Sequence, residues 1–294
     1  MTTRIGVLSD LHSKNFESLK KAVEILKDES IDALVLNGDI YESKLESPYM
    51  INGFADFLKY LREQDFMTFI QPGHSETVSG SKYEAILGFN SSSVIYVPRA
   101  KQRAFKVGDY HLLFLPGARI SDGDPSRNVF FLTKSYQTGY YEWGPDSNFS
   151  SLGILSDNWR EGTRFAIFNI EDIRTYAKKI SDIEKAVLFS HISPRFSTDK
   201  AIDVSYRPLN NLLSLPLNYG DIDLKEIIED TGINKVITGH YHDSVHRAHD
   251  GKEEPIEAGE WSKELFFMAS YMNQNKFGLI ELDGDKIRYY KLKL

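Results

Sequence analysis

The chain contains no cysteine among its 294 residues, which excludes a disulfide framework and any metal site built on thiolate ligands. It also lacks an apolar run long enough to cross a bilayer. Met1 leads straight into the first apolar segment, without a charged and then apolar leader. We therefore expect a cytoplasmic protein with no membrane segment.

Positive charge is outnumbered by negative charge, with 35 Lys and Arg residues against 42 Asp and Glu residues. The formal net charge is −7 and no basic stripe is visible, whereas a broad grip on extended nucleic acid needs a basic face. Internal repeats and low-complexity segments are missing too, and 41% of the residues are hydrophobic. This length and composition are enough for one large domain or a domain plus a cap, and we take residues 1–294 as a single domain. The charge leaves a short nucleotide open as a partner. None of these features indicates the oligomeric state.

Apolar periodicity indicates alternating strands and helices in the first hundred residues. Residues 16–29 and 50–62 carry apolar side chains at helical spacing, and short apolar runs surround them at 5–8, 34–36 and 68–70. Such alternation implies a parallel sheet with helices on its faces. Further segments predict strands at 186–189 and 236–238, a helix at 224–230, and hairpins at 105–107 with 110–115 and at 277–282 with 287–292.

Ligand-type side chains follow five of the predicted strands. They are two carboxylates and five imidazoles: Asp10, His12, Asp39, His74, His191, His240 and His242. Residues just past the carboxyl ends of parallel strands line one crevice, so we expect these groups to meet. Singly, each is more often a turn or structural residue; together they suit Zn, Fe or Mn, and seven groups fit two ions that share a bridging carboxylate. The remaining histidines belong to no motif and are expected to be structural or exposed: His111, His246 and His249.

In order and spacing these blocks resemble the calcineurin-like metallophosphoesterases, whose pattern is Asp-x-His, Gly-Asp, Gly-Asn-His-Asp/Glu, a lone His and Gly-His-x-His. The chain reads Asp10-Leu11-His12, Gly38-Asp39, Gly73-His74-Ser75-Glu76, His191 and Gly239-His240-Tyr241-His242. The resemblance implies an α/β fold in which a two-sheet β-sandwich is flanked by helices. It implies one metal held by Asp10, His12, Asp39 and His242. A second would be held by Asp39, His191, His240 and the residue at the family's Asn position, so that Asp39 bridges.

The resemblance also implies a function. Two divalent ions, Mn, Fe or Zn, about 3.5–4 Å apart would hold a hydroxide that attacks a phosphodiester or phosphomonoester. A small or nucleotide-like substrate is expected; a nuclease of the same family and a catalytically weak metal-binding scaffold are the alternatives. The Asp-Arg-Gly of protein Ser/Thr phosphatases is missing, because the chain reads Gly38-Asp39-Ile40-Tyr41-Glu42-Ser43-Lys44. In this stretch Glu42 is either a solvated loop charge or a residue that supports the metal ligands.

One block departs from the family pattern. Aligned without a gap, Pro72-Gly73-His74-Ser75-Glu76 puts His74 at the Asn ligand position and Ser75 at the catalytic His position. A histidine ring can replace the amide as a ligand, but Ser75 cannot donate a proton near neutral pH as a histidine does. A gapped alignment instead keeps His74 as the catalytic residue. The ungapped alignment is favoured, and under both one role in the usual catalytic set, which also includes Asp39, is altered.

Residues 118–170 do not fit the simple alternation of strand and helix. They are too rich in aromatic residues for a disordered linker and contain too much glycine for one long helix. We interpret them as an ordered insertion with its roots near the metal edge. It is either a cap that shapes the substrate pocket or an extra packing layer or oligomer interface. As a cap it would offer substrate-binding candidates: Arg127, Tyr140, Tyr141 and Trp143.

Overall fold

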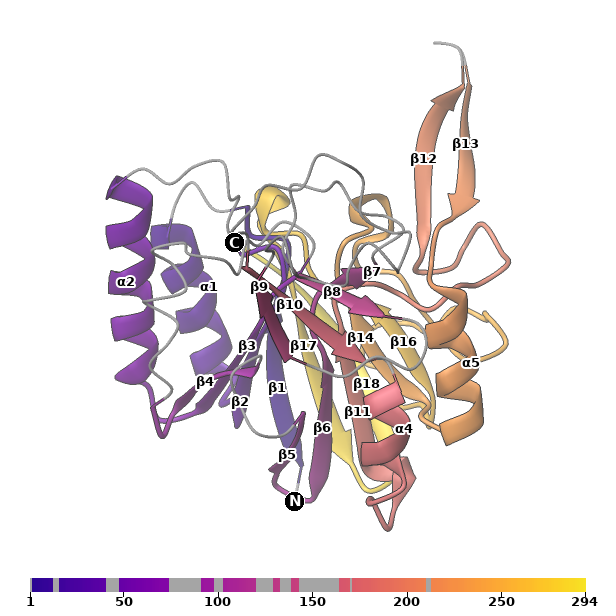
Figure 1. Ribbon diagram of the computed structural model, residues 1–294, viewed down its shortest axis with the longest axis horizontal. Helices are drawn as coiled ribbons and strands as arrows, with labels where there is room; N and C mark the ends of the chain where they lie inside the picture. Colours follow the sequence, from indigo (N-terminus) through magenta and orange to yellow (C-terminus); the bar gives the residue numbers. More distant parts are fainter. Residues whose placement is uncertain are drawn as a thin grey trace.

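Two six-stranded sheets lie face to face between two pairs of helices, with α1 and α2 on one flank and α4 and α5 on the other (Figure 1). The computed structural model describes residues 2–12, 16–40, 48–73, 91–97, 103–119, 129–132, 139–142, 164–169, 171–209 and 213–294. The arrangement is the helix-flanked α/β sandwich expected from the sequence.

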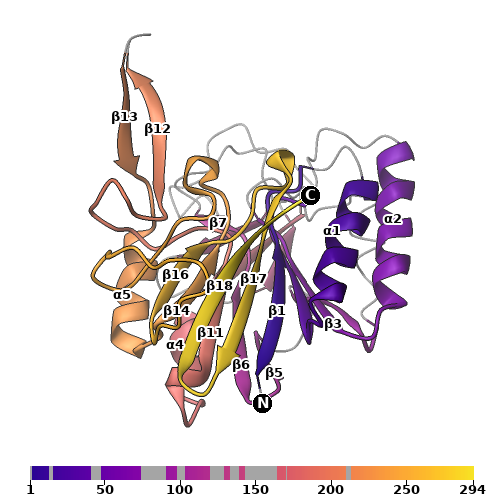
Figure 2. The same ribbon diagram turned by 180° about the vertical axis from the view of Figure 1, so that it is seen from behind.

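The first sheet has the strand order β18-β17-β1-β2-β3-β4. Its strands are β1 (Thr3–Leu8), β2 (Ala33–Asn37), β3 (Met67–Gln71), β4 (Val94–Tyr96), β17 (Lys276–Asp283) and β18 (Lys286–Lys293). The four strands β1 to β4 are parallel, whereas β17 and β18 form the predicted antiparallel hairpin and pair with β1. Helices α1 (Phe16–Asp28) and α2 (Pro48–Arg62) cover the outer face, as Figure 2 shows from behind.

The second sheet has the order β15-β16-β14-β11-β6-β5. Its strands are β5 (Ala104–Val107), β6 (Tyr110–Leu115), β11 (Ala186–Ser190), β14 (Lys235–Thr238), β15 (Ala248–His249) and β16 (Leu265–Met268). Four inner strands are parallel and both edge strands are antiparallel. Outside it lie α4 (Glu171–Ala177) and α5 (Ile222–Thr231), which begins at the N-cap Asp221. Short 3₁₀ turns are η4 (Ile183–Lys185), η5 (His242–Ser244) and η6 (Met272–Gln274).

Three apolar cores hold these layers together. Strand β2 shows the principle: Ala33 and Val35 face the core between the sheets, while Leu34 and Leu36 face the core beneath α1 and α2. Because both faces are buried, the strand reads as a continuous apolar run in the sequence. The third core lies between the second sheet and helices α4 and α5.

Two further β-structures stand outside the sandwich. The backbone of the aromatic-rich segment forms a small sheet of β7 (Ala118–Arg119), β8 (Val129–Leu132), β9 (Gly139–Glu142) and β10 (Arg164–Asn169), in the order β7-β8-β10-β9. Strands β12 (Val204–Leu209) and β13 (Leu213–Asn218) form an antiparallel ribbon that projects beyond the rest of the molecule in Figures 1 and 2. In the described ranges no helix is long and apolar enough to cross a membrane.

Candidate metal centre

The predicted ligands follow β1, β2, β11 and β14, whose carboxyl ends meet at one edge of the sandwich. Backbone hydrogen bonds tie the ligand loops to one another: Asp10 N donates to Gly38 O over 3.0 Å, and His12 N donates to Asp39 O over 2.9 Å. Four ligand-type residues adopt a positive φ there: Asp10 (54°), His12 (37°), Asp39 (50°) and His240 (75°). Backbone strain of this kind clusters at functional sites because surrounding structure must hold it.

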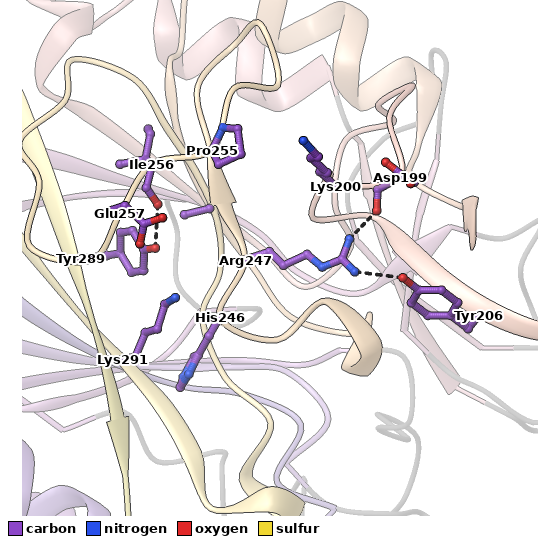
Figure 3. Close-up of a pocket in the computed structure, with 11 residues that line it drawn as sticks. Asp199, Lys200, Tyr206, His246, Arg247, Pro255, Ile256, Glu257, Tyr289 and Lys291 are labelled. Carbon is purple, nitrogen blue, oxygen red and sulfur yellow. Dashed lines mark hydrogen bonds between the residues drawn. The ribbon is translucent and has the colours of Figure 1, made fainter. Parts of the chain in front are cut away.

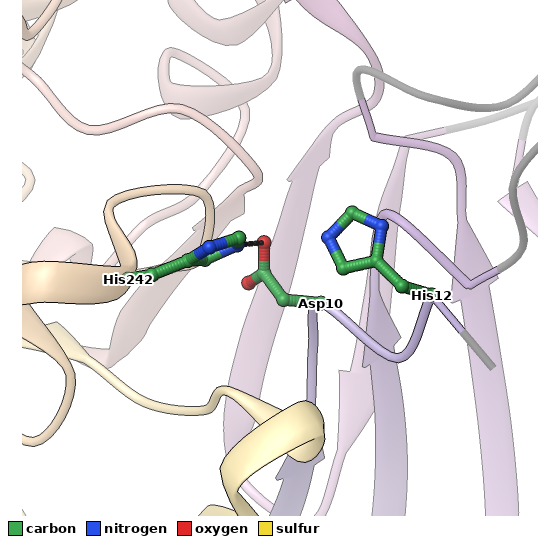
Figure 4. Close-up of side chains that lie close together, drawn as sticks. All are labelled: Asp10, His12 and His242. Atoms are coloured by element: carbon green, nitrogen blue, oxygen red, sulfur yellow. Dashed lines mark hydrogen bonds and ion pairs between the residues drawn. The ribbon is translucent and has the colours of Figure 1, made fainter. Parts of the chain in front are cut away.

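One group of donors consists of Asp10, His12 and His242 (Figure 4). Their ligand atoms all lie within 4.8 Å of one another. Nε2 of His242 is 3.0 Å from Oδ1 of Asp10, and the ring centroids of His12 and His242 are 5.5 Å apart. The backbone N–H of His240 also donates to Oδ2 of Asp10 over 2.9 Å. One carboxylate and two imidazoles therefore converge on a volume of the size of one ion.

A second group, Asp39, His191 and His240, lies beside the first and has the same spacing of ligand atoms. The Asp39 carboxylate faces both groups: Oδ1 is 3.2 Å from Nε2 of His191, and Oδ2 is 3.8 Å from Nε2 of His12. A carboxylate with one oxygen toward each group can bind two cations at once.

The histidine at the end of β11 shows that the set suits a cation. Nδ1 of His191 lies 2.9 Å from the backbone O of Asn37, and a carbonyl can only accept, so Nδ1 carries the proton. In a neutral ring Nε2 then directs a lone pair at the Asp39 carboxylate across 3.2 Å. Two lone pairs at that distance need a cation between them, which is a proton on Nε2 when no metal is bound. Imidazole and carboxylate donors without thiolate fit Mn, Fe or Zn.

Electrostatics at the edge favour charged carboxylates. Burial acts to raise the pKa of both Asp10 and Asp39, but neighbouring imidazoles outweigh it: the hydrogen bond from His242 lowers the pKa of Asp10, and the charge of His191 holds the pKa of Asp39 well below its usual range. Burial also acts to lower the pKa of His191, yet the Asp39 carboxylate raises it to about 10. Burial and the charge of His191 lower the pKa of His240 to about 4. Both carboxylates are thus ionised at neutral pH.

Two glycines are required by the close approach of the ligand loops. A Cβ on Gly239 would lie 2.0 Å from Oγ of Ser9 and 2.8 Å from Oδ2 of Asp10. Gly38 has a φ of +88°, and a Cβ there would lie 2.5 Å from Nδ1 of His191. The glycines of the Gly-Asp and Gly-His-x-His blocks therefore make room for the ligands beside them.

Three residues that motif reasoning did not single out support the ligands. Oγ of Ser9 is 2.5 Å from Oδ2 of Asp10, and the ring of Tyr271 stacks on His242 with centroids 3.9 Å apart and planes 9° from parallel. Asn37 accepts from His191 through its backbone. All three stand at or just past the end of a strand that meets this edge, but that position alone does not distinguish a supporting residue from a turn residue.

The other sequence-derived candidates lie mostly outside the described residues. These are His74, Ser75, Arg127, Trp143 and Glu42. Tyr140 and Tyr141 belong to strand β9, where their backbone pairs with Ala166 and Phe165 of β10. The start of the small sheet lies beside the metal edge. Gly117 N, just before β7, donates to Pro72 O over 2.8 Å. The next residue after Pro72 is Gly73, which adjoins Asp39.

A cavity of about 400 Å³ opens between the edges of the two sheets, apart from the metal ligands (Figure 3). It is lined by Asp199, Lys200, Tyr206, His246, Arg247, Ala248, Pro255, Ile256, Glu257, Tyr289 and Lys291. The Arg247 guanidinium is hydrogen-bonded to other residues that line the cavity. It donates to Asp199 O over 2.6 Å and to the Tyr206 hydroxyl over 3.3 Å. Cations and carboxylates both line the cavity, so its charge does not select one kind of ligand.

Comparison with known proteins agrees with this fold. Two similar solved structures are a protein from Thermus thermophilus (12% identity, 99% of each chain covered, TM-score 0.55) and a dimetal phosphatase from Danio rerio (10% identity, 99% of this chain and 98% of that chain, TM-score 0.51). At such identities they show the fold alone. No curated protein sequence matches significantly. The family model for calcineurin-like phosphoesterases matches residues 3–244, which include both donor groups. The chain therefore belongs to the calcineurin-like phosphoesterase family.

Proposed function

We propose that the protein is a dinuclear metal-dependent phosphoesterase that hydrolyses small or nucleotide-like phosphodiesters or phosphomonoesters. The observation that carries the proposal is the Asp39 carboxylate, which directs one oxygen toward an imidazole of each donor group. Such a carboxylate is suited to bridging two cations and offsetting their mutual repulsion.

In the proposed centre Asp10, His12 and His242 hold one ion, and His191 and His240 hold the other. Asp39 contributes to both ligand sets, and under the ungapped alignment His74 completes the second. The set carries two negative charges when the imidazoles are neutral, which partly balances two divalent ions and leaves a net positive field for a phosphoryl oxygen. When bound, a pair of divalent ions supplies a nucleophile at neutral pH and neutralises charge on the phosphoryl group.

The protein itself positions the reacting groups. Burial of Asp10 and His191 keeps bulk water from one side of the centre, so charge interactions there are stronger than at the surface. The aromatic-rich residues 118–170 are proposed to cover the open side as a cap. The hydrogen bond between Gly117 and Pro72 supports this proposal, because it places the start of the segment beside the ligand loops.

The test combines metal content with hydrolysis. Protein reconstituted with Mn²⁺ or Zn²⁺ is expected to bind two ions per chain and to cleave bis-p-nitrophenyl phosphate, p-nitrophenyl phosphate or both. Asp39→Asn is expected to reduce occupancy of both sites and to abolish turnover. Asp109→Asn, in the exposed turn between β5 and β6, is the matched control and should change neither. One tightly bound ion or fewer in the wild-type protein would refute the dinuclear centre.

The same panel separates the substrate classes. A preference for the diester over the monoester would indicate a phosphodiesterase, and cleavage of a short oligonucleotide at a comparable rate would indicate the nuclease alternative. Two bound ions without turnover on any of these compounds would point to the metal-binding scaffold instead.

A further inference from the structure

The last residue of β2 joins the two sheets directly beneath the donor groups. Asn37 is fully buried, and its side-chain Nδ2 lies 3.1 Å from the backbone O of Ser190 and 3.4 Å from that of Ile237. Ser190 ends β11 and Ile237 lies in β14, so one amide from the first sheet donates to two strands of the second. Oδ1 of Asn37 accepts a hydrogen bond from Gln71, its neighbour in register on β3.

This connection between the sheets bears on the geometry of the metal centre, because each donor group contains residues from both sheets. Asp10 and His12 follow β1 in the first sheet, but their group is completed by His242 from the second. Asp39 follows β2 in the first sheet, whereas its companions His191 and His240 follow β11 and β14. The distances among the ligand atoms are therefore set by how far apart, and in which register, the sheets sit.

Apolar contacts alone would leave the separation and register of the two sheets loosely defined. The core between the sheets includes aliphatic side chains such as Val7, Val35 and Ile237, whose attraction is not directional. Hydrogen bonds have a narrow range of length and angle, and leaving a buried amide or carbonyl unpaired is costly. The Asn37 amide thus adds a directional restraint on the separation of the sheets directly beneath the donor groups.

The backbone of the same residue orients a ligand. The carbonyl O of Asn37 accepts from Nδ1 of His191 and lies 3.1 Å from Oγ of Ser9, which in turn contacts Asp10. Shifting Asn37 would therefore disturb a residue of each donor group at once.

From these contacts we propose that Asn37, supported by Gln71, is a positioning residue that fixes the separation of the two halves of the metal centre. It touches no substrate and acts through His191, Asp10 and the strands that carry the ligands. The inference rests on the proposed dinuclear centre, but its consequences appear in metal binding and not only in turnover.

The experiment replaces the amide by an apolar side chain of similar size. Asn37→Leu is expected to weaken binding of at least one Mn²⁺ ion by about 10–100-fold in competition with a chelator, the range typical of residues that support metal ligands. It should also alter the exchange coupling between the two Mn²⁺ ions seen by electron paramagnetic resonance. A general loss of stability would not by itself change that coupling in the folded, loaded protein.

Thr238→Val is the matched control. Thr238 is equally buried, ends β14 at the same edge, and its hydroxyl lies 3.5 Å from Phe267 O within its own sheet. We expect this variant to keep wild-type affinity and coupling. Gln71→Met removes only the donor to Asn37, so it should change Mn²⁺ affinity and exchange coupling in the same direction as Asn37→Leu but by less. It replaces Asn37→Leu as the test variant if Asn37→Leu does not fold.

Wild-type affinity and coupling in Asn37→Leu, or in Gln71→Met where the first does not fold, would overturn the proposal. So would an equal loss in Thr238→Val, because it would assign the effect to any buried polar change at this edge. A wild-type protein that binds two ions but hydrolyses nothing would refute the enzymatic function and leave the positioning role standing. A wild-type protein that binds fewer than two would refute both.

Discussion

At the scale of single residues, the meeting of the six described donors could be predicted and the residues that support them could not. Asp10, His191 and His240 sit in short local patterns after apolar runs, so their meeting follows from strand order alone. The role of Asn37 depends on partners 153 and 200 residues away in the chain. A short sequence pattern does not indicate contacts between two sheets, and an Asn before Gly-Asp cannot be distinguished from an ordinary turn residue.

The departure at His74 and Ser75 remains a prediction, since both lie outside the described residues. If Ser75 occupies the position of the proton donor, Ser75→His should raise turnover of alkyl phosphates more than that of p-nitrophenyl esters, whose leaving group needs less protonation. General acid catalysis typically contributes about 10²–10⁴-fold. Steady-state rates on both substrate types measure the difference.

The companion change at the neighbouring position decides between the two alignments. Under the ungapped alignment His74→Ala should weaken one metal site. If His74→Ala instead leaves both ions bound and removes turnover, then His74 is the catalytic residue and the gapped alignment is correct.

His246 predicts a pH-dependent stability. Burial, aided by the charges of Lys276 and Lys291, lowers its pKa to about 4, although the bond to Phe277 O opposes the shift. Between the ordinary pKa of 6.5 and 4 the unfolded chain binds a proton that the folded chain does not, so the free energy of unfolding falls as the pH falls. The contribution is on the order of 1–3 kcal/mol.

Substitution by asparagine isolates this contribution. His246 has a φ of 66°, a backbone conformation that Asn tolerates well, so His246→Asn removes the titration with little added strain. Urea unfolding at several pH values from 7.5 to 4.5 should show a shallower decline for His246→Asn than for the wild type. Parallel declines would show that His246 does not carry the effect.

At the scale of elements, regular strands and helices were accessible from the sequence and the projecting ribbon was not. The helix predicted at 224–230 is α5 (Ile222–Thr231), and both predicted hairpins are confirmed. The ribbon of β12 and β13 contains Pro208 and Pro216, and proline within a run argues against a strand in a sheet interior. An isolated ribbon has two open edges, so proline is tolerated there.

The base of the ribbon is fastened to the loop that carries His242. Oδ2 of Asp243 accepts from Ser205 Oγ and Tyr206 N, each over 2.9 Å, and Ser244 Oγ donates to Val204 O over 2.6 Å. A lone two-stranded ribbon is marginally stable in water. Asp243→Ala should therefore speed amide exchange at Tyr206 by roughly 10-fold, corresponding to the loss of about 1–2 kcal/mol of partly exposed, charge-assisted hydrogen bonding.

The control for this change lies in the preceding loop. The exposed Asp199 side chain makes no hydrogen bond to the described part of the chain, so Asp199→Ala should leave exchange in the ribbon unchanged. Unaltered exchange in Asp243→Ala would show that the ribbon is supported by other contacts.

At the scale of the whole molecule, the family pattern predicted the sandwich, whereas the alternation of strands and helices alone indicated only a parallel sheet. The difference lies in β17, β18, β5 and β15, antiparallel strands that make both sheets mixed. A hairpin signal in the sequence does not say which sheet the hairpin joins. That choice depends on which buried faces complement one another in three dimensions.

Ions bound at the proposed centre, between the sheets, should stabilise the entire fold. A ligand that binds only the folded chain adds about 2.7 kcal/mol per site at a free concentration 100 times its Kd. Removing metal with a chelator should therefore lower the midpoint of thermal unfolding by several degrees, and returning Mn²⁺ should restore it. Scanning calorimetry with and without metal measures the shift.

The matched pair of aspartate variants tests the origin of that stabilisation. Asp39→Asn should lose most of the metal-dependent gain, whereas Asp109→Asn should keep it. Equal midpoints in the presence and absence of metal for the wild type would mean that the ions do not join the sheets.

The left-handed backbone at four positions also limits which substitutions the chain can accept there during evolution. These positions are Asp10, His12, Asp39 and His240. A replacement there must donate to a cation and tolerate a positive φ, and Asp, Asn and His are the non-glycine residues found most often in that conformation. Glycine relaxes the backbone but removes the donor, and glutamate keeps a donor but strains the backbone. We expect a lineage released from selection for metal binding to accumulate glycine at these four positions first. Descendants that have lost the proposed metal centre would then be recognisable from their sequences alone.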